Sequence, residues 1–113
     1  MGLFISGISG YGQAINFPDD NFISKLLLAD SSNQIAQNQA SAYFKIDANN
    51  DGEIDVAEAL EVSVLNINNS NIFDATGLTY FSNLKKLNCS NNLIPSLSLT
   101  GMTQLIELKC TNN

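Results

Sequence analysis

Residues 47–58 read Asp-Ala-Asn-Asn-Asp-Gly-Glu-Ile-Asp-Val-Ala-Glu. Side chains that carry oxygen stand at the first, third, fifth, ninth and twelfth positions of this stretch. Gly52 is sixth, where a sharp turn with positive φ has no steric cost for glycine. Ile54 is eighth, and we expect this apolar side chain to point into the core. The stretch therefore predicts a tight loop that is lined with oxygen atoms.

This spacing matches the twelve-residue calcium loop of an EF-hand without a mismatch. Calcium prefers about six to eight oxygen ligands, and the loop offers them at the expected positions. A backbone carbonyl is expected to bind at the seventh position, a water-bridged carboxylate at the ninth and a bidentate carboxylate at the twelfth. An acidic turn that fits by chance is the competing interpretation. We predict a Ca²⁺ cofactor with these metal ligands: Asp47, Asn49, Asp51, Glu53, Asp55 and Glu58.

The role of the ion depends on whether a second loop exists. Sensor EF-hands usually come in pairs, but the earlier stretch Asp30-Ser-Ser-Asn-Gln-Ile35 lacks the sixth-position glycine and the closing glutamate. A structural ion, which fixes a bend without signalling, is therefore the favoured interpretation. A calcium sensor remains the alternative.

Composition excludes several classes of function. The 113 residues allow one domain, or one domain with a small module. The net charge of −6, with five Lys and Arg in total, argues against nucleic acid and against anionic membrane surfaces. The absence of histidine removes His-based nucleophile triads and the usual zinc sites. No stretch approaches about 20 apolar residues, so no transmembrane segment is expected. We predict that the chain is not an enzyme.

The chain is expected to have three parts. Residues 1–15 form a leader that resembles a signal-peptide remnant without its basic flank, or else a simple disordered or edge-strand leader. Residues 16–62 form a helical cap around the calcium loop 47–58. Within the cap, helices are predicted from near Pro18 to Ala29, over 34–46, and over 56–62. Residues 63–113 change to a repeating pattern.

The repeating pattern consists of three segments, which are residues 62–70, 84–92 and 105–113. They fit L-x-x-L-x-[L/I/C]-x-x-N, except that Ser70 replaces the asparagine in the first. Leu65 and Leu87 are 22 residues apart, and Leu87 and Leu108 are 21 apart. A period of about 20–29 with this consensus is typical of leucine-rich repeats. The predicted fold is α/β, with a helical EF-hand-like cap followed by a short solenoid of parallel strands, incomplete at its C-terminal end.

Alternation along these strands divides their side chains between two faces. Leucine and cysteine positions point inward, and the outward positions form a concave face (Lys86, Asn88, Ser90, Glu107, Lys109 and Thr111). Solenoids bind proteins or glycans on such faces, so a protein or glycan ligand is predicted there. Cys89 and Cys110 occupy equivalent inward positions on adjacent strands, which suits a disulfide poorly. Two free, buried thiols are favoured over a disulfide.

The order of these features resembles a secreted bacterial leucine-rich repeat protein of the Bacteroidetes type, and more loosely the internalin group. The resemblance covers FPDDNFISKLLLAD (17–30), FKIDANNDGEIDVAEAL (44–60) and TGLTYFSNLKKLNCSNNLIPSLSLTGMTQLIELKC (76–110). It implies a helical N-terminal cap with one calcium loop, secretion or attachment to the bacterial cell surface, and further sequence beyond residue 113. On this basis the chain is expected to be the N-terminal fragment of a longer protein.

Three functions are compatible with these features. The first, which we predict, is a non-catalytic extracellular or cell-surface leucine-rich repeat binding module with one structural calcium site, and the other two are its alternatives. The second is an N-terminal accessory region of a larger secreted enzyme. The third is a dockerin-like, calcium-dependent interaction module, which ranks last because dockerins carry two calcium loops and this chain has one.

Overall fold

A computed structural model describes residues 13–113. The predicted signal-peptide remnant lies outside the described residues, except for positions 13–15. The described part contains two α-helices, α1 (Asp20–Leu28) and α2 (Val56–Leu60), and a short 3₁₀-helix, η1 (Leu78–Tyr80). It also contains four strands: β1 (Ala36–Asn38), β2 (Val62–Asn66), β3 (Lys86–Asn88) and β4 (Glu107–Lys109).

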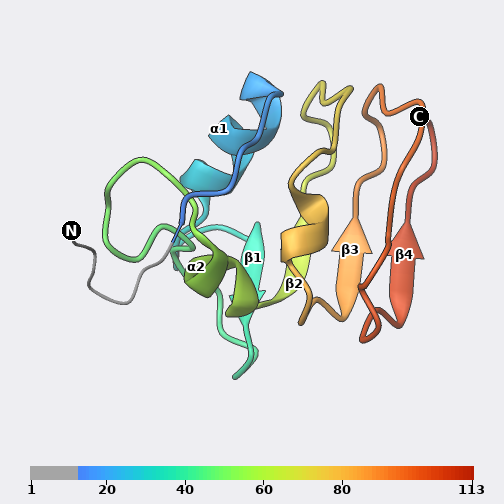
Figure 1. Ribbon diagram of the computed structural model, residues 1–113. Coiled ribbons are helices and arrows are strands. Elements are labelled where there is room, and N and C mark those ends of the chain that lie inside the picture. The colour runs from blue at the N-terminus through green and yellow to red at the C-terminus, as the bar shows by residue number, and fades with distance from the viewer. Residues whose placement is uncertain (1–12) are drawn as a thin grey trace.

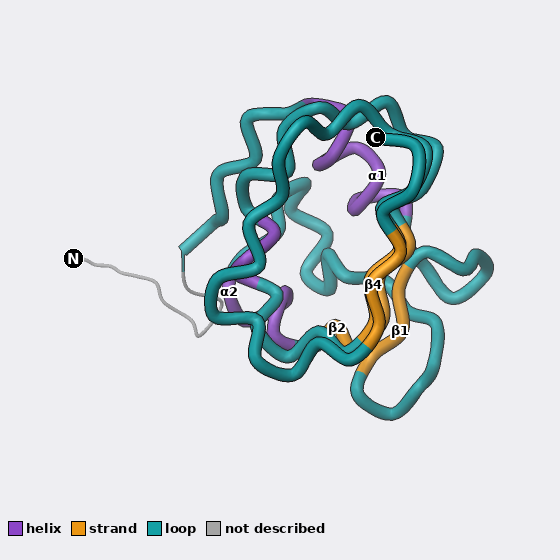
Figure 2. The backbone as a smooth tube through the Cα atoms, turned by 90° about the vertical axis from the view of Figure 1, so that its right-hand side faces the viewer, coloured by secondary structure: helices purple, strands orange, loops and turns teal. Residues whose placement is uncertain are grey.

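The four strands form one mixed sheet in the order β1-β2-β3-β4 (Figure 1). β1 is antiparallel to β2, whereas β2, β3 and β4 are parallel to one another. Leu65, Leu87 and Leu108 are partners in neighbouring strands, so the leucine spacing read from the sequence equals the register of the sheet. Viewed along the row of strands, the sheet forms one side of the molecule, α2 and connecting loops lie across from it, and α1 lies near one end of the strands (Figure 2).

The prediction of a leucine-rich repeat solenoid behind a helical cap is wrong. The structure is a small α/β domain whose single mixed sheet is neither closed nor curled, and the sheet begins with an antiparallel strand drawn from the predicted cap. The three leucine-containing strands do pair in parallel, but parallel pairing at a regular spacing does not by itself produce a solenoid. The division of the chain at residue 62 stays a prediction.

The helix predicted over residues 34–46 is also wrong, because asparagine side chains hold this backbone in turns. Asn33 lies beyond the end of α1, and its side-chain amide donates to the carbonyl of Leu28, the last residue of that helix. The Asn38 side chain accepts from the backbone N–H groups of Ala40 and Ala42. Such local bonds compete with helix formation. The backbone of residues 36–38 is instead stabilised by pairing with β2, and it forms strand β1.

Helix α1 forms where the sequence predicts it. Asp19 is its N-cap, and Asp19 Oδ1 accepts from the backbone N–H of Asn21 and of Phe22. Phe22 and Leu26, four residues apart, are fully buried on one face. The Phe22 ring meets that of Phe17 edge to face, with 5.1 Å between centroids, and Phe17 also lies against Phe81. This aromatic group joins α1 to the segment around η1.

Asparagine side chains also link successive turns after the strands. Asn92 is buried, accepts from the backbone N–H of Ser70 and of Ile72, and donates to the carbonyls of Ile67 and Cys89. Asn113 takes the same role one strand later, because its amide donates to the carbonyls of Cys89 and Cys110. These bonds satisfy backbone groups that would otherwise lack partners near the core.

Candidate metal centre

The loop 47–58 begins after the buried Ile46 and turns through two residues with positive φ, Asn50 (58°) and Gly52 (80°). The Asp47 side chain shapes this turn. Its Oδ1 accepts from the backbone N–H of Asp51 at 3.2 Å, and its Oδ2 accepts from that of Gly52 at 3.0 Å. The carboxylate of Asp47 is buried, so these bonds hold it toward the inside of the loop.

The second half of the loop is the start of helix α2. Asp55 is the N-cap, and its carboxylate accepts from the backbone N–H of Glu58 at 2.8 Å. Glu58 Oε1 accepts in return from the backbone N–H of Asp55 at 3.1 Å. This reciprocal capping box fixes the Glu58 side chain at the first turn of α2. The exit helix was predicted over 56–62, and it ends at Leu60 because β2 starts at Val62.

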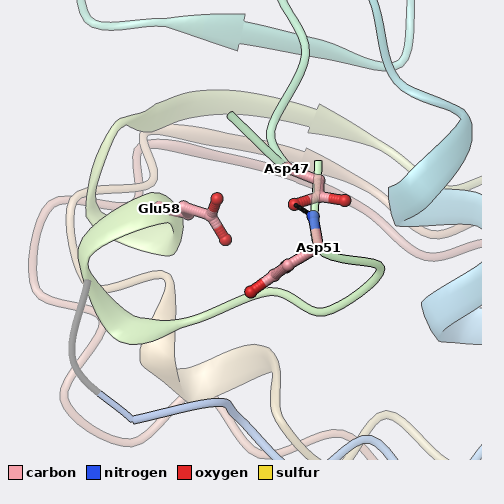
Figure 3. Close-up of side chains that lie close together, drawn as sticks. All are labelled: Asp47, Asp51 and Glu58. Atoms are coloured by element: carbon pink, nitrogen blue, oxygen red, sulfur yellow. Dashed lines mark hydrogen bonds between the residues drawn. The ribbon is translucent and has the colours of Figure 1, made fainter. Parts of the chain in front are cut away.

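The turn and the capping box bring three carboxylates together. Asp47, Asp51 and Glu58 each offer an oxygen atom, and these atoms lie within 4.8 Å of one another. Figure 3 shows the three side chains converging on one space, with the Asp51 N–H donating to Asp47. Asp47 and Glu58 are buried, while Asp51 lies on the solvent side. The cluster can hold a metal ion, and hard oxygen donors suit a hard cation.

The other three predicted ligands lie around this cluster. Asn49 is exposed, and its side-chain amide donates to Asp51 Oδ2 at 3.3 Å. Glu53 is exposed, and its backbone N–H donates to Asp51 Oδ1. Asp55 is committed to the cap of α2 and stays outside the three-carboxylate cluster. Their roles as ligands remain predictions.

The electrostatics of the loop favour a cation. Burial raises the pKa of Glu58, and the charges of Asp55 and Asp47 raise it further, against the lowering effect of backbone N–H donors. The sequence contains no Lys or Arg between Lys45 and Lys85 that could offset these charges. Holding like charges close together is unfavourable, and a bound cation would relieve that repulsion.

The surroundings of the loop differ from a helix–loop–helix arrangement. The expected entry helix is absent from residues 34–46, and an N-terminal segment braces the loop instead. The Ile15 N–H donates to the Ile54 carbonyl at 2.9 Å, and the Val56 N–H donates to the Gln13 carbonyl at 3.3 Å. Ile54 is buried as predicted. Residues 13–15 are predicted to be part of the leader, but these hydrogen bonds place them in the fold, and the apolar Ile15, which is buried, is the signal for this in the sequence.

A second surface was predicted on the strands. Lys86, Asn88, Glu107 and Lys109 line one shallow depression of about 160 Å³, which also includes Tyr43. Ser90 does not belong to this outward face as predicted, because it is buried and bonds to Thr111. Cys89 and Cys110 are both free, and burial raises the pKa of Cys89. Cys110 is exposed, in contrast to the prediction, because it follows the edge strand β4.

No family model and no curated protein matches this chain. The chain is similar to the solved structure of CBM51-2 in complex with GlcNAc and INT domains from Clostridium perfringens ZmpB, with a TM-score of 0.62 and 21% sequence identity. The similarity covers 88% of this chain and 18% of that chain, so the matched part is a small fraction of that protein. At this identity the likeness establishes the fold alone.

This likeness corrects the resemblance drawn from sequence. The expected kinship with Bacteroidetes-type or internalin-like leucine-rich repeat proteins is wrong, since residues 13–113 match a region of ZmpB in fold and form one mixed sheet instead of a solenoid. In the described part of the chain, no helix is both long and apolar enough to cross a membrane.

Proposed function

We propose that this chain is a non-catalytic accessory region of a larger secreted or surface-attached bacterial protein, stabilised by one structural Ca²⁺ ion. The convergence of Asp47, Asp51 and Glu58 within 4.8 Å carries the proposal. The likeness to a small fraction of ZmpB supports an accessory role better than a free-standing binding module. A dockerin-like role is less favoured, because dockerins carry two calcium loops and this sequence shows one.

The ion would be held mainly by oxygen atoms of the loop. Asp47, Asn49, Asp51 and Glu58 would bind through side chains, Glu53 through its carbonyl, and Asp55 through water. When bound, Ca²⁺ would neutralise part of the charge that burial and proximity make unfavourable. Extracellular calcium modules bind at about 10⁻⁴–10⁻³ M, and we expect an affinity of that order.

The effect of the ion would reach the sheet through α2. This helix is five residues long, and β2 begins two residues after it ends. Its last carbonyl, of Leu60, accepts from the Asn83 side chain at 3.0 Å on the segment that leads into β3. Binding of the ion by the loop would therefore fix the orientation of α2 relative to β2.

The test compares calcium binding of the wild type with that of three variants, by calorimetric titration and thermal melts: Asp47→Ala and the matched pair Glu58→Gln and Glu61→Gln. Glu58→Gln keeps an acceptor for the capping box but removes one carboxylate. Glu61→Gln makes the same change at an exposed position after α2. We expect one ion per chain, a melting temperature raised by millimolar calcium, and loss of binding in Asp47→Ala.

In the same titrations, Glu58→Gln should bind calcium at least about tenfold more weakly, because a bidentate charged ligand is lost. Glu61→Gln should bind as the wild type does. Unchanged calcium affinity in Glu58→Gln would show that the loop assignment is wrong.

We also propose a protein or glycan ligand for the depression on the strands. An exposed aromatic ring, Tyr43, beside amide and charged side chains supports this assignment, because such groups stack on and bond to polar ligands. Once a ligand has been found by glycan or protein screening, Tyr43→Ala should weaken its binding roughly tenfold. Equal affinity in Tyr43→Ala and the wild type would place the ligand elsewhere.

A further inference from the structure

A row of side chains runs across one face of the sheet. Tyr43 forms a bridge with Gln37, and Gln37 is the partner of Val64 in β2. Val64 is the partner of Lys86, which is in turn the partner of Glu107 in β4. Partners in adjacent strands point to the same face of a sheet. These five side chains therefore share one face, and Tyr43 and Lys86 are three strand spacings apart, or about 14 Å.

A second row on the same face lies two residues further along the strands. Asn66 is the partner of Asn88, and Asn88 is the partner of Lys109. Residues of both rows line the depression on the strands, and so does Gln34. An amide both donates and accepts hydrogen bonds, as does a hydroxyl group. The three amides therefore suit the hydroxyl groups of a sugar, whereas the centre of a protein interface is more apolar.

Charged side chains gather at the end of the depression that is remote from Tyr43. Lys86 stands beside Glu107, and Lys109 follows Glu107 by two residues on the same strand. One carboxylate is thus shared between two ammonium groups. The two lysines and one glutamate leave one positive charge in excess, on a chain whose net charge is −6. An anionic group of a ligand is therefore attracted to this end of the depression.

Building on the ligand site proposed above, we propose that the depression binds an acidic oligosaccharide, a chain of sugars that carries a carboxylate group. Lys86 and Lys109 hold the carboxylate, because charge-assisted hydrogen bonds are stronger than neutral ones. Tyr43 is 37% exposed, and its ring offers an apolar face to a second sugar. The amides between these two ends bind hydroxyl groups. The distance of about 14 Å between Tyr43 and Lys86 requires more than one sugar ring.

The test measures binding by calorimetric titration of the whole chain at one fixed concentration of calcium. The probes are tetrasaccharides that contain glucuronic, galacturonic or sialic acid, and the same tetrasaccharides after reduction of each carboxyl group to an alcohol. We expect acidic forms to bind, and the reduced forms to bind at least about tenfold more weakly. Tetraglutamate, which has the charge without the sugars, should bind no better than the reduced forms.

Variants separate direct contact from the general charge of the chain. Lys86→Gln and Lys109→Gln should each weaken binding of the acidic forms roughly tenfold. Glu107→Gln removes the competing carboxylate and should strengthen that binding about threefold. Lys85→Gln makes the same change at an exposed neighbour of Lys86 that lies outside the depression, and should leave the affinity unchanged. Circular dichroism of each variant checks that the fold is retained.

Several outcomes would overturn the assignment of an acidic sugar. Equal binding of the acidic and reduced forms would do so, and so would equal binding of tetraglutamate, but a loss in Tyr43→Ala would still place a ligand in the depression. An equal effect of Lys85→Gln and Lys86→Gln would show that only the general charge acts. Binding of none of the probes, by a chain that still takes up calcium, would overturn the assignment and leave the calcium site standing.

Discussion

At the scale of single residues, Asp19 connects two distant parts of the chain. Its Oδ1 caps helix α1, while its Oδ2 accepts from the backbone N–H of Phe73 at 2.8 Å and of Asp74 at 3.0 Å. Burial acts to raise the pKa of this carboxyl, but the four backbone donors outweigh it and the pKa lies below its ordinary value. Asp19 is thus stabilised in its charged form by contacts that exist only in the folded chain.

The lowered pKa of Asp19 makes its contribution to stability dependent on pH. The stabilisation is fully present above the unfolded pKa, about 3.9, and is lost as pH falls through the lower folded value. In Asp19→Asn, a side-chain NH₂ group would replace the oxygen that accepts from the backbone N–H groups of Phe73 and Asp74. This variant should lower the free energy of unfolding at neutral pH by about 1.5–3 kcal/mol. Urea denaturation measures this loss, and the difference from the wild type should shrink in acid.

Asp20→Asn provides the control for this prediction, since Asp20 is the exposed neighbouring residue in the first turn of α1. It should change stability by no more than about 0.5 kcal/mol. A loss in Asp19→Asn as small as that in Asp20→Asn would mean that the bonds to Phe73 and Asp74 contribute nothing measurable.

At the scale of elements, the start of η1 depends on a glycine. Gly77 has φ of 106°, and a Cβ built there would lie 2.5 Å from Cδ1 of Phe17. The Phe17 ring is buried and packs against Phe22 and Phe81, so it has little room to move aside. Both backbone geometry and packing therefore require glycine at this position.

Gly77→Ala should be more damaging than the same change at Gly101. Gly101 also has positive φ (79°), but a Cβ there would meet no atom within 4 Å. In both variants the free energy of unfolding should fall by about 1–2 kcal/mol, because alanine is strained in the left-handed region. In Gly77→Ala it should fall by roughly a further 1–3 kcal/mol through overpacking against Phe17. Urea denaturation of the two variants checks the difference. Equal losses would show that Phe17 adapts without cost.

At the scale of the whole molecule, hydrogen bonds between distant segments join the predicted cap to the strands. Asn21 on α1 donates to the carbonyl of Asn71, and Asp19 bonds to residues 73 and 74. β1, from the predicted cap, pairs with β2. The candidate metal centre lies at the entry to α2, which leads directly into the same sheet. An ion bound there would therefore stabilise a fold in which both parts share one core.

Several features of this protein could be read from local sequence. The loop 47–58, its turn at Gly52 and the start of α2 follow from residues within a dozen positions of one another, because turn and capping bonds are short in sequence. The amphipathic pattern that places Phe22 and Leu26 on one face is equally local. The spacing of Leu65, Leu87 and Leu108 also predicted which residues would align across the parallel strands.

Other features were decided only by tertiary structure. Residues 36–38 became a strand because β2 offered partners 24 to 29 residues away, and a helical pattern in the sequence could not reveal that competition. The bracing of the loop by residues 13–15 and the second role of Asp19 rest on backbone donors and acceptors. Every residue carries such groups, so their pairing leaves no signature in the side chains and becomes fixed only when the chain folds.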